Sequence, residues 1–324
     1  MKYIFSILCI SVILYAFPLN EKTLMDISRT YGYYQGQLYT LNTIQKKYPD
    51  LANQVFVAKT KFNLSFGDVT QHVDLIMDKY PEWKSIKKSI VANTRKKINL
   101  DGLTHRQAVN FITAVEQRAK GKVESPVLET LLILKPDYKK NPEKEFYDGF
   151  KKRYQCNDFK KSKGVDFLID IPMSWASKKA NRPNIVRKFI SNNGHGPAIA
   201  MVLVKNIPDG KTISESDIKN AMNKNDMETM LPPNAILKGY GFIKLEGLPG
   251  YWQRFTITVQ RLKQKLTIET LSYTFFYKNK LIQIQFQVAN LHNSKLNKIF
   301  QKYESLFDSI INSFVLTDVY RRLM

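Results

Sequence analysis

Residues 245–260 read LEGLPGYWQRFTITVQ, in which glycines and a proline precede an alternating run of residues. Successive side chains of a β-strand point to opposite faces of the sheet. Phe255 and Ile257 therefore share one face with Val259, whereas Trp252 and Arg254 share the other face with the threonines. The stretch predicts a turn that leads into an antiparallel strand with an apolar core face.

The downstream sequence repeats this alternation in two further segments. KLTIETLSYTFFY (265–277) precedes LIQIQFQV (281–288), and Lys278-Asn279-Lys280 lies between them as a predicted tight turn. The second segment alternates branched or aromatic residues with three glutamines, at positions 283, 285 and 287. We expect these glutamines to share one polar sheet face with Arg254 and the threonines of the preceding strand.

The first part of the chain shows a helical period instead. Apolar residues recur at spacings of three and four through residues 21–122, which is typical of amphipathic helices. Pro49 and Pro81 end two of these segments, Asp68 is a predicted N-cap, and Thr104 begins a helix that Gly121 stops. This pattern predicts a bundle of five short helices.

The change of period divides the chain. We predict a helical domain over 17–122, a helical linker over 123–160 and a sheet-containing domain over 161–324. Long antiparallel strands followed by a closing amphipathic helix give an α+β fold with helix packed on sheet.

The N-terminal residues predict the cellular location of the protein. MKYIFSILCISVILYA has a lysine, a short apolar run and a small residue at Ala16, the layout of a secretory signal peptide over 1–16. We expect a secreted or periplasmic protein cleaved near Ala16, with an uncleaved membrane anchor as the alternative. After cleavage Cys156 is the single cysteine, so no internal disulfide is expected.

Four segments in the second half carry a resemblance to a known family. They are DFLIDIPMSW (166–175), LPGYWQRFTITV (248–259), YTFFYKNKLIQIQFQV (273–288) and ESLFDSIINSFVL (304–316). Their order resembles the PsbP-like family of the photosystem II extrinsic subunit and the related Mog-type fold. The resemblance implies an antiparallel-sheet α/β/α sandwich whose closing helix ends in a segment containing Ser313-Phe314. It also implies a non-enzymatic binding or assembly role.

No common catalytic motif occurs in the sequence: GxSxG, the P-loop, GxGxxG, HExxH and CxxC are all absent. We expect no catalytic residue, metal or cofactor. The candidate binding residues are Tyr251, Trp252 and Arg254. Trp252 lies next to Arg254 at the margin of the polar strand face, and exposed aromatic side chains are favoured at interfaces. His195 is the fourth, since it lies between two glycines in the loop NNGHGP.

The sequence therefore predicts an exported, non-enzymatic binding or assembly protein with a protein or small-molecule partner. One alternative is an exported hydrolase that uses His195 with Asp166 or Asp170. Another is a polyanion-binding protein, because the formal net charge is +22. Such a charge allows contact with anionic membrane surfaces, although an AT-rich coding sequence would also produce it. No specific nucleic acid is expected.

Overall fold

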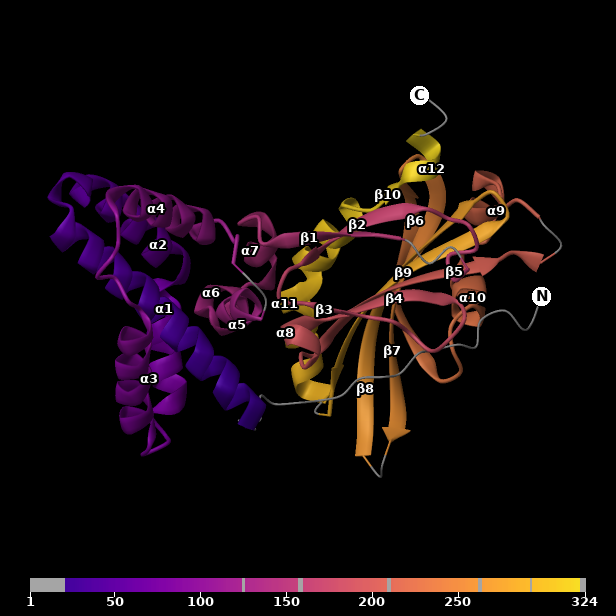
Figure 1. The fold of residues 1–324 in the computed structure, drawn as a ribbon. Coiled ribbons are helices and arrows are strands. Elements are labelled where there is room, and N and C mark those ends of the chain that lie inside the picture. Colours follow the sequence, from indigo (N-terminus) through magenta and orange to yellow (C-terminus); the bar gives the residue numbers. More distant parts are fainter. Residues whose placement is uncertain are drawn as a thin grey trace. The chain divides into compact units, whose positions relative to one another are not determined.

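The computed structural model describes residues 21–123, 126–156, 160–208, 211–261, 264–291 and 293–320. One compact unit spans Phe17–Phe150, and a second includes Lys151–Met324 (Figure 1). The predicted signal peptide lies outside the described residues. The α+β order is confirmed, since the first unit is helical and the second contains antiparallel sheets. Of the helices described, none has the length and apolar character needed to cross a membrane.

The helical unit contains four longer helices followed by three short ones. These are α1 (Glu21–Lys47), α2 (Ala52–Met77), α3 (Trp83–Lys97), α4 (His105–Ala119), α5 (Val127–Leu134), α6 (Pro136–Lys140) and α7 (Pro142–Tyr147), with the 3₁₀ turn η1 (Pro49–Leu51) between α1 and α2. Thr104 caps α4 through a reciprocal capping box with Gln107, and Gly121 follows its end at a positive φ of 86°. The predicted limits of α4 are thus confirmed by ordinary cap chemistry.

The predicted helix start at Asp68 was wrong. Helix α2 runs through this position, because its buried stripe continues unbroken from Phe66 to Val69 and Val73. The Asp68 carboxylate instead lies 3.2 Å from the ammonium of Lys135, which is buried and also donates to the Ser65 carbonyl. A residue typical of helix caps therefore joins α2 to the loop after α5.

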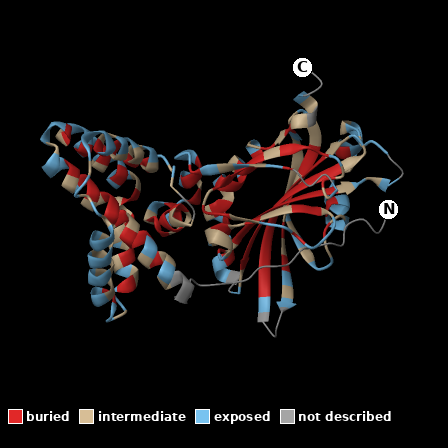
Figure 2. Ribbon diagram, viewed as in Figure 1, coloured by how far each residue is buried: buried red, intermediate tan, exposed pale blue. Residues whose placement is uncertain are grey.

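The second unit contains two antiparallel sheets and its own helices. The small sheet has the order β1-β2-β10, and the large sheet has the order β3-β4-β5-β9-β8-β7-β6. The strands are β1 (Lys151–Gln155), β2 (Phe167–Pro172), β3 (Ala176–Lys178), β4 (Ile185–Ile190), β5 (Ala198–Asn206), β6 (Ala235–Leu245), β7 (Leu248–Arg261), β8 (Gln264–Tyr277), β9 (Lys280–Asn290) and β10 (Val315–Leu316). Figure 2 shows that burial is concentrated in the middle strands of the large sheet.

Two tight hairpins set the pairing of the long strands. Leu245 pairs with Leu248, so Glu246 and Gly247 alone form the β6–β7 turn, both at positive φ. This is the backbone that two-residue hairpin loops prefer. Tyr277 pairs with Lys280, which confirms a tight turn at the predicted place between β8 and β9. Pro249 and Gly250 therefore belong to β7 and not to the turn.

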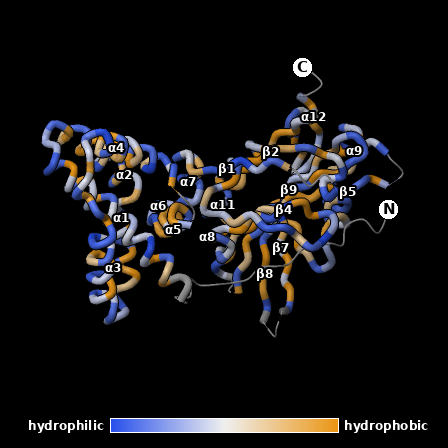
Figure 3. The backbone as a smooth tube through the Cα atoms, in the orientation of Figure 1, coloured by the Kyte–Doolittle hydropathy of each residue, from blue (hydrophilic) through white to orange (hydrophobic). Residues whose placement is uncertain are grey.

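The prediction of one shared polar face was wrong. Arg254 pairs with Leu271, and Leu271 pairs with Phe286, so Arg254 lies on the same face as the apolar residues of β9. The three glutamines of β9 lie on the opposite face, with Tyr251 and Phe255. A shift of one residue in register exchanges the two faces, and alternation within a single strand does not reveal that register. Figure 3 shows hydrophobic and hydrophilic segments mixed along the strands of the large sheet.

Helices cover both faces of the large sheet. Helix α11 (Asn293–Asn312) packs on β8 and β9, on the face that contains Arg254. Helices α9 (Glu215–Asn220) and α10 (Lys224–Thr229) pack over β6 and β7 on the other face, where Ile218 and Met227 contact Tyr251. The three-layer α/β/α arrangement is confirmed.

The expected segment Ser313-Phe314 directly follows α11. The Ser313 hydroxyl oxygen accepts a hydrogen bond from the Asp170 backbone N–H at 2.9 Å. The Phe314 ring is fully buried and lies 5.2 Å from the ring of Phe167 and 5.3 Å from that of Phe275, centroid to centroid. The end of α11 thereby joins the small sheet to the large one.

Gly250 provides a test of the β7–β8 pairing. A Cβ at this position would lie 2.2 Å from the Thr274 carbonyl oxygen, which is backbone and cannot move aside without breaking the sheet pairing. We expect Gly250→Ala to lower the free energy of unfolding by more than about 2 kcal/mol, measured by urea denaturation. Gly102→Ala is the control, because a Cβ there meets nothing within 4 Å. Equal stability of the two variants would contradict this pairing.

Candidate functional site

Arg254 connects the large sheet to α11. Its guanidinium donates to the Glu269 carboxylate on β8 at 2.7 Å and to the Glu304 carboxylate on α11 at 3.1 Å. The same group lies 4.1 Å from the centre of the Phe300 ring, a cation–π geometry. Two carboxylates therefore surround this cation, and the side chain is a structural clamp between sheet and helix.

Trp252 lies beside this clamp on the same face of β7. Its partner across the β6–β7 pair is Gly241, where a Cβ would lie 2.5 Å from the indole nitrogen. A Cβ at Gly239 would lie 3.2 Å from the far edge of the same ring. The glycines of β6 thus make room for the indole against the backbone, and the side chain stays partly exposed. This explains why a tryptophan is tolerated there.

Tyr251 points to the opposite face and is buried among α9, α10 and β8. It packs against Ile218 and Met227, and only 3% of the residue is exposed. Burial raises the pKa of the Tyr251 hydroxyl to about 12, because the phenolate would lose its hydration. The structure therefore separates the neighbours Tyr251 and Trp252 onto two faces.

His195 is exposed and belongs to a different part of the sheet unit. It follows the short helix α8 (Ser191–Gly194) and precedes β5. Three strand spacings, or roughly 14 Å, separate β5 from β7 in the order β5-β9-β8-β7. The structure thus brings Trp252 and Arg254 together but places His195 apart from both. As ligand contacts, all four residues remain predictions.

The two carboxylates considered for a hydrolase are both buried. Asp166 is 2% and Asp170 is 4% exposed. The Arg153 guanidinium donates to both oxygens of Asp170, at 2.7 and 3.1 Å, and Lys151 lies 3.5 Å away. The hydrogen bonds from Arg153 hold the pKa of the Asp170 carboxyl below its usual value. Asp170 thus joins β1 to β2 as an ion-pair partner.

The Asp170 ion pair predicts a pH dependence of stability. A carboxyl whose pKa is lower in the folded state stabilises the fold above the unfolded pKa, about 3.9, and loses this contribution as pH falls through the folded pKa. We expect Asp170→Asn to lower the urea midpoint at pH 7. The difference from wild type should shrink below about pH 4. A difference that is constant from pH 7 to below the folded pKa would contradict the ion-pair role.

The clamp at Arg254 predicts a stability pattern across the single variants Arg254→Leu and Glu269→Leu and the double variant that combines them. Arg254→Leu leaves the Glu269 carboxylate, 5% exposed, without its closest cation, and we expect a loss of about 3 kcal/mol in unfolding free energy. The double variant Arg254→Leu, Glu269→Leu should recover much of this loss, because no buried charge is left unpaired. Chemical denaturation of the three proteins measures both effects. A double variant less stable than either single variant would exclude the clamp.

A row of uncharged polar side chains crosses the other face of the large sheet. Gln283, Gln285 and Gln287 of β9 are all buried, and Gln283 donates to the Thr274 hydroxyl at 3.2 Å. Within the described part of the chain, the Gln287 amide and the hydroxyls of Thr270 and Ser272 have no hydrogen-bond partner. Each such group costs about 1–3 kcal/mol unless water or another molecule satisfies it. This polar interior was missed because its residues come from separate strands.

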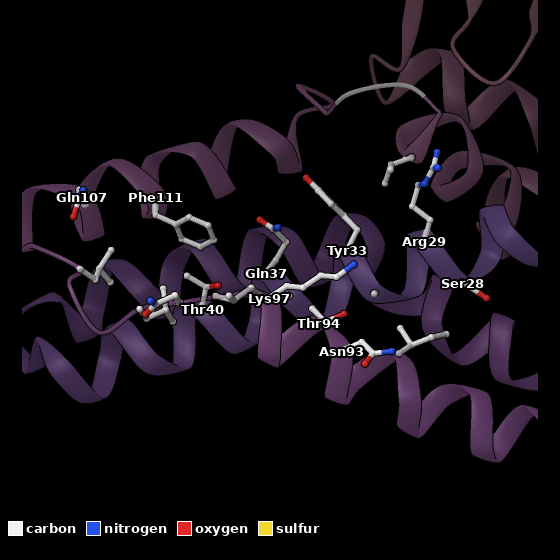
Figure 4. A pocket seen from close by; sticks show the side chains of 18 of the residues that line it. Ser28, Arg29, Tyr33, Gln37, Thr40, Asn93, Thr94, Lys97, Gln107 and Phe111 are labelled. Carbon is white, nitrogen blue, oxygen red and sulfur yellow. The ribbon is translucent and has the colours of Figure 1, made fainter.

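The helical unit contains a large groove whose lining residues come from separate helices. It has a volume of about 1020 Å³ and is lined by α1, α3, α4 and the segment between α3 and α4. Figure 4 shows Ser28, Arg29, Tyr33, Gln37 and Thr40 along one side, with side chains of α3 and α4 facing them. The volume is at the upper end of the range for small-molecule sites.

The groove has a distinct chemistry. The two basic residues that line it are Arg29 and Lys97, and none of its lining residues is acidic. In Figure 4 the Lys97 side chain extends along the groove toward Tyr33. The remaining lining combines amides and hydroxyls with aromatic rings, from residues that include Gln37, Thr40, Asn93, Thr94, Asn99, Gln107 and Phe111. The groove therefore suits a ligand that carries negative charge and many hydrogen-bonding groups.

Two contacts fix the floor of this groove. Gln37 is 8% exposed, and its side-chain oxygen accepts a hydrogen bond from Arg118 at 2.6 Å. The guanidinium of Arg118 also lies 5.3 Å from the Phe111 ring centre.

A sequence signal for the groove exists in Gly32 and Gly36, spaced by four residues on α1. A Cβ at Gly32 would lie 3.1 Å from Ile90, so α1 and α3 cross closely there.

Comparisons with known proteins find neighbours among solved structures. No family model matches this chain, and no curated protein does. Among solved structures, cyanobacterial PsbP (CyanoP) from Synechocystis sp. PCC 6803 is 17% identical, with a TM-score of 0.33, over 51% of this chain and 92% of that chain. LpqN of Mycobacterium tuberculosis, involved in cell envelope biogenesis, is 10% identical, with a TM-score of 0.31, over 52% and 92%. A Bacteroides thetaiotaomicron protein is 13% identical, with a TM-score of 0.27, over 46% and 44%.

Proposed function

We propose that this chain is an exported, non-enzymatic binding or assembly protein whose helical unit binds a hydroxyl-rich anionic ligand. The observation that supports this is the groove of about 1020 Å³ with cationic, amide, hydroxyl and aromatic lining and no acidic residue. The lysine and the apolar run at the N-terminus support export.

The groove's composition favours an acidic saccharide as the ligand class. Asn, Gln and Thr side chains offer both donors and acceptors, which match sugar hydroxyls. Arg29 and Lys97 supply charge-assisted hydrogen bonds to a carboxylate or sulfate. Phe111 and Tyr33 provide ring surfaces for the apolar faces of sugar rings. A lining of this kind orients the ligand through several weak hydrogen bonds and ring contacts and one or two strong charge-assisted hydrogen bonds.

Calorimetric titration with an oligogalacturonate tests this proposal, with a neutral malto-oligosaccharide of equal length as comparison. We expect binding of the acidic ligand only. Lys97→Gln should weaken binding about tenfold, because a hydrogen bond to a charged group contributes about 1.5–3 kcal/mol. Phe111→Ala should weaken it to a similar degree through loss of ring contact.

Lys96→Gln is the matched control. Lys96 is the neighbour of Lys97 on α3 and is exposed, but it does not line the groove. The Lys96→Gln variant loses one positive charge from the same helix, so its affinity for the acidic ligand should equal that of wild type. Equal weakening by both lysine variants would instead indicate non-specific attraction by a basic surface, and no binding of the acidic ligand would refute the proposal.

A further inference from the structure

A second pocket lies at the edge of the large sheet, in the unit that does not contain the groove. It has a volume of about 180 Å³, well below the ~300 Å³ at which sites for larger organic ligands begin. Its lining comes from β3, β4, the start of β5 and the loop around His195: Lys178, Lys179, Lys188, Ile190, Gly194, Gly196 and Ile199. Three of these seven residues are lysines, and none is acidic.

Two of the lysines face each other directly. Lys178 of β3 pairs with Lys188 of β4 in the antiparallel register, so both side chains lie on the same face of the sheet. Like charges in directly opposed positions destabilise a strand pair. Lys179 adds a third positive charge at the end of β3. An anion between these ammonium groups would turn mutual repulsion into attraction.

The loop that completes the pocket has an uncommon backbone. Asn192, Asn193 and Gly194 have consecutive positive φ values of 49°, 51° and 92°. Residues other than glycine rarely adopt this conformation, and such strain is concentrated at binding and active sites. The loop is held in place by the Ser191 hydroxyl, which accepts a hydrogen bond from the Ala198 backbone N–H at 3.1 Å.

Both glycines of the loop lie in close contact with neighbouring groups. A Cβ at Gly194 would lie 2.8 Å from the Lys178 ammonium nitrogen, which shows that this lysine rests against the loop backbone. A Cβ at Gly196 would lie 2.1 Å from the Ser191 hydroxyl oxygen. The strained backbone therefore allows the loop to approach the lysines without a side chain between them.

From this geometry we infer that the pocket binds one small oxyanion, such as phosphate or the phosphate group of a larger molecule. Lys178 and Lys188 supply two positive charges from directly paired positions, and Lys179 directly follows β3. The glycine loop forms the remaining wall. The inference is independent of the groove in the helical unit, because it uses other residues and another ligand.

Thermal unfolding with inorganic phosphate tests this inference in the full chain. Phosphate should raise the Tm of wild type by at least about 3 °C at saturation, compared with sodium chloride of equal ionic strength. The double variant Lys178→Gln, Lys188→Gln should show no such rise. Without phosphate this variant should still unfold in one cooperative transition, which shows that the missing response is not caused by loss of the fold.

The control is Lys238→Gln, Lys265→Gln, which removes two exposed lysines from other strands of the same sheet. It should retain the full phosphate effect. Chemical shifts of the Gly194 and Gly196 amides, followed by NMR during the titration, should move in wild type and in this control. An equal Tm rise in all three proteins, or an equal effect of chloride, would overturn the inference.

Vesicles distinguish the sources of the phosphate group. Wild type that sediments with phosphatidylglycerol vesicles, and is released from them by free phosphate, would assign the pocket to a lipid headgroup. The Lys178→Gln, Lys188→Gln variant should then not sediment with the vesicles. Phosphate binding without sedimentation would assign the pocket to a soluble phosphate. Sedimentation that is equal in wild type and variant, together with no phosphate effect on Tm, would refute the site.

Discussion

The pairing register of β7, β8 and β9 is the constraint on which the sheet unit depends. It places Arg254 opposite Leu271, and Leu271 opposite Phe286, so that one face receives α11 and the other receives α9 and α10. Because side chains alternate with a period of two, a slip of one residue would exchange every contact between the sheet and its helices. The two-residue turn between β8 and β9 fixes part of this register locally. The Arg254 contacts to Glu269 and Glu304 depend on this alignment.

Glycines at close contacts are a second recurrent feature of the structure. Glycines admit Trp252 against β6, allow β7 to approach β8 at Gly250 and bring α1 near α3 at Gly32. In the helical unit the close crossing of α1 and α3 borders the groove, which Gly32 and Gly36 line.

Much of the secondary structure could be predicted from local pattern. The hairpin after Tyr277, the capping box at Thr104 and the closing helix before Ser313 follow from turn, cap and period rules that involve neighbouring residues only. The continuous helix α2 could not be predicted at Asp68, since a cap residue is locally acceptable there and only tertiary burial of Phe66 and Val69 decides the outcome. The candidate pair Trp252 and Arg254 was correctly placed on one face, but the carboxylates and the Phe300 ring around Arg254 come from other segments.

The sequence by itself determined the order of helical and sheet regions, the strands and their alternation, and the basic character of the chain. Tertiary structure alone decided which polar residues share a face, that Arg254 is held between two carboxylates, and that Lys178 lies directly opposite Lys188. It also decided that α1, α3 and α4 leave a groove between them. The reason is that strand register and helix crossing are set by contacts between residues far apart in the chain, and these contacts leave no periodic signal in any single segment.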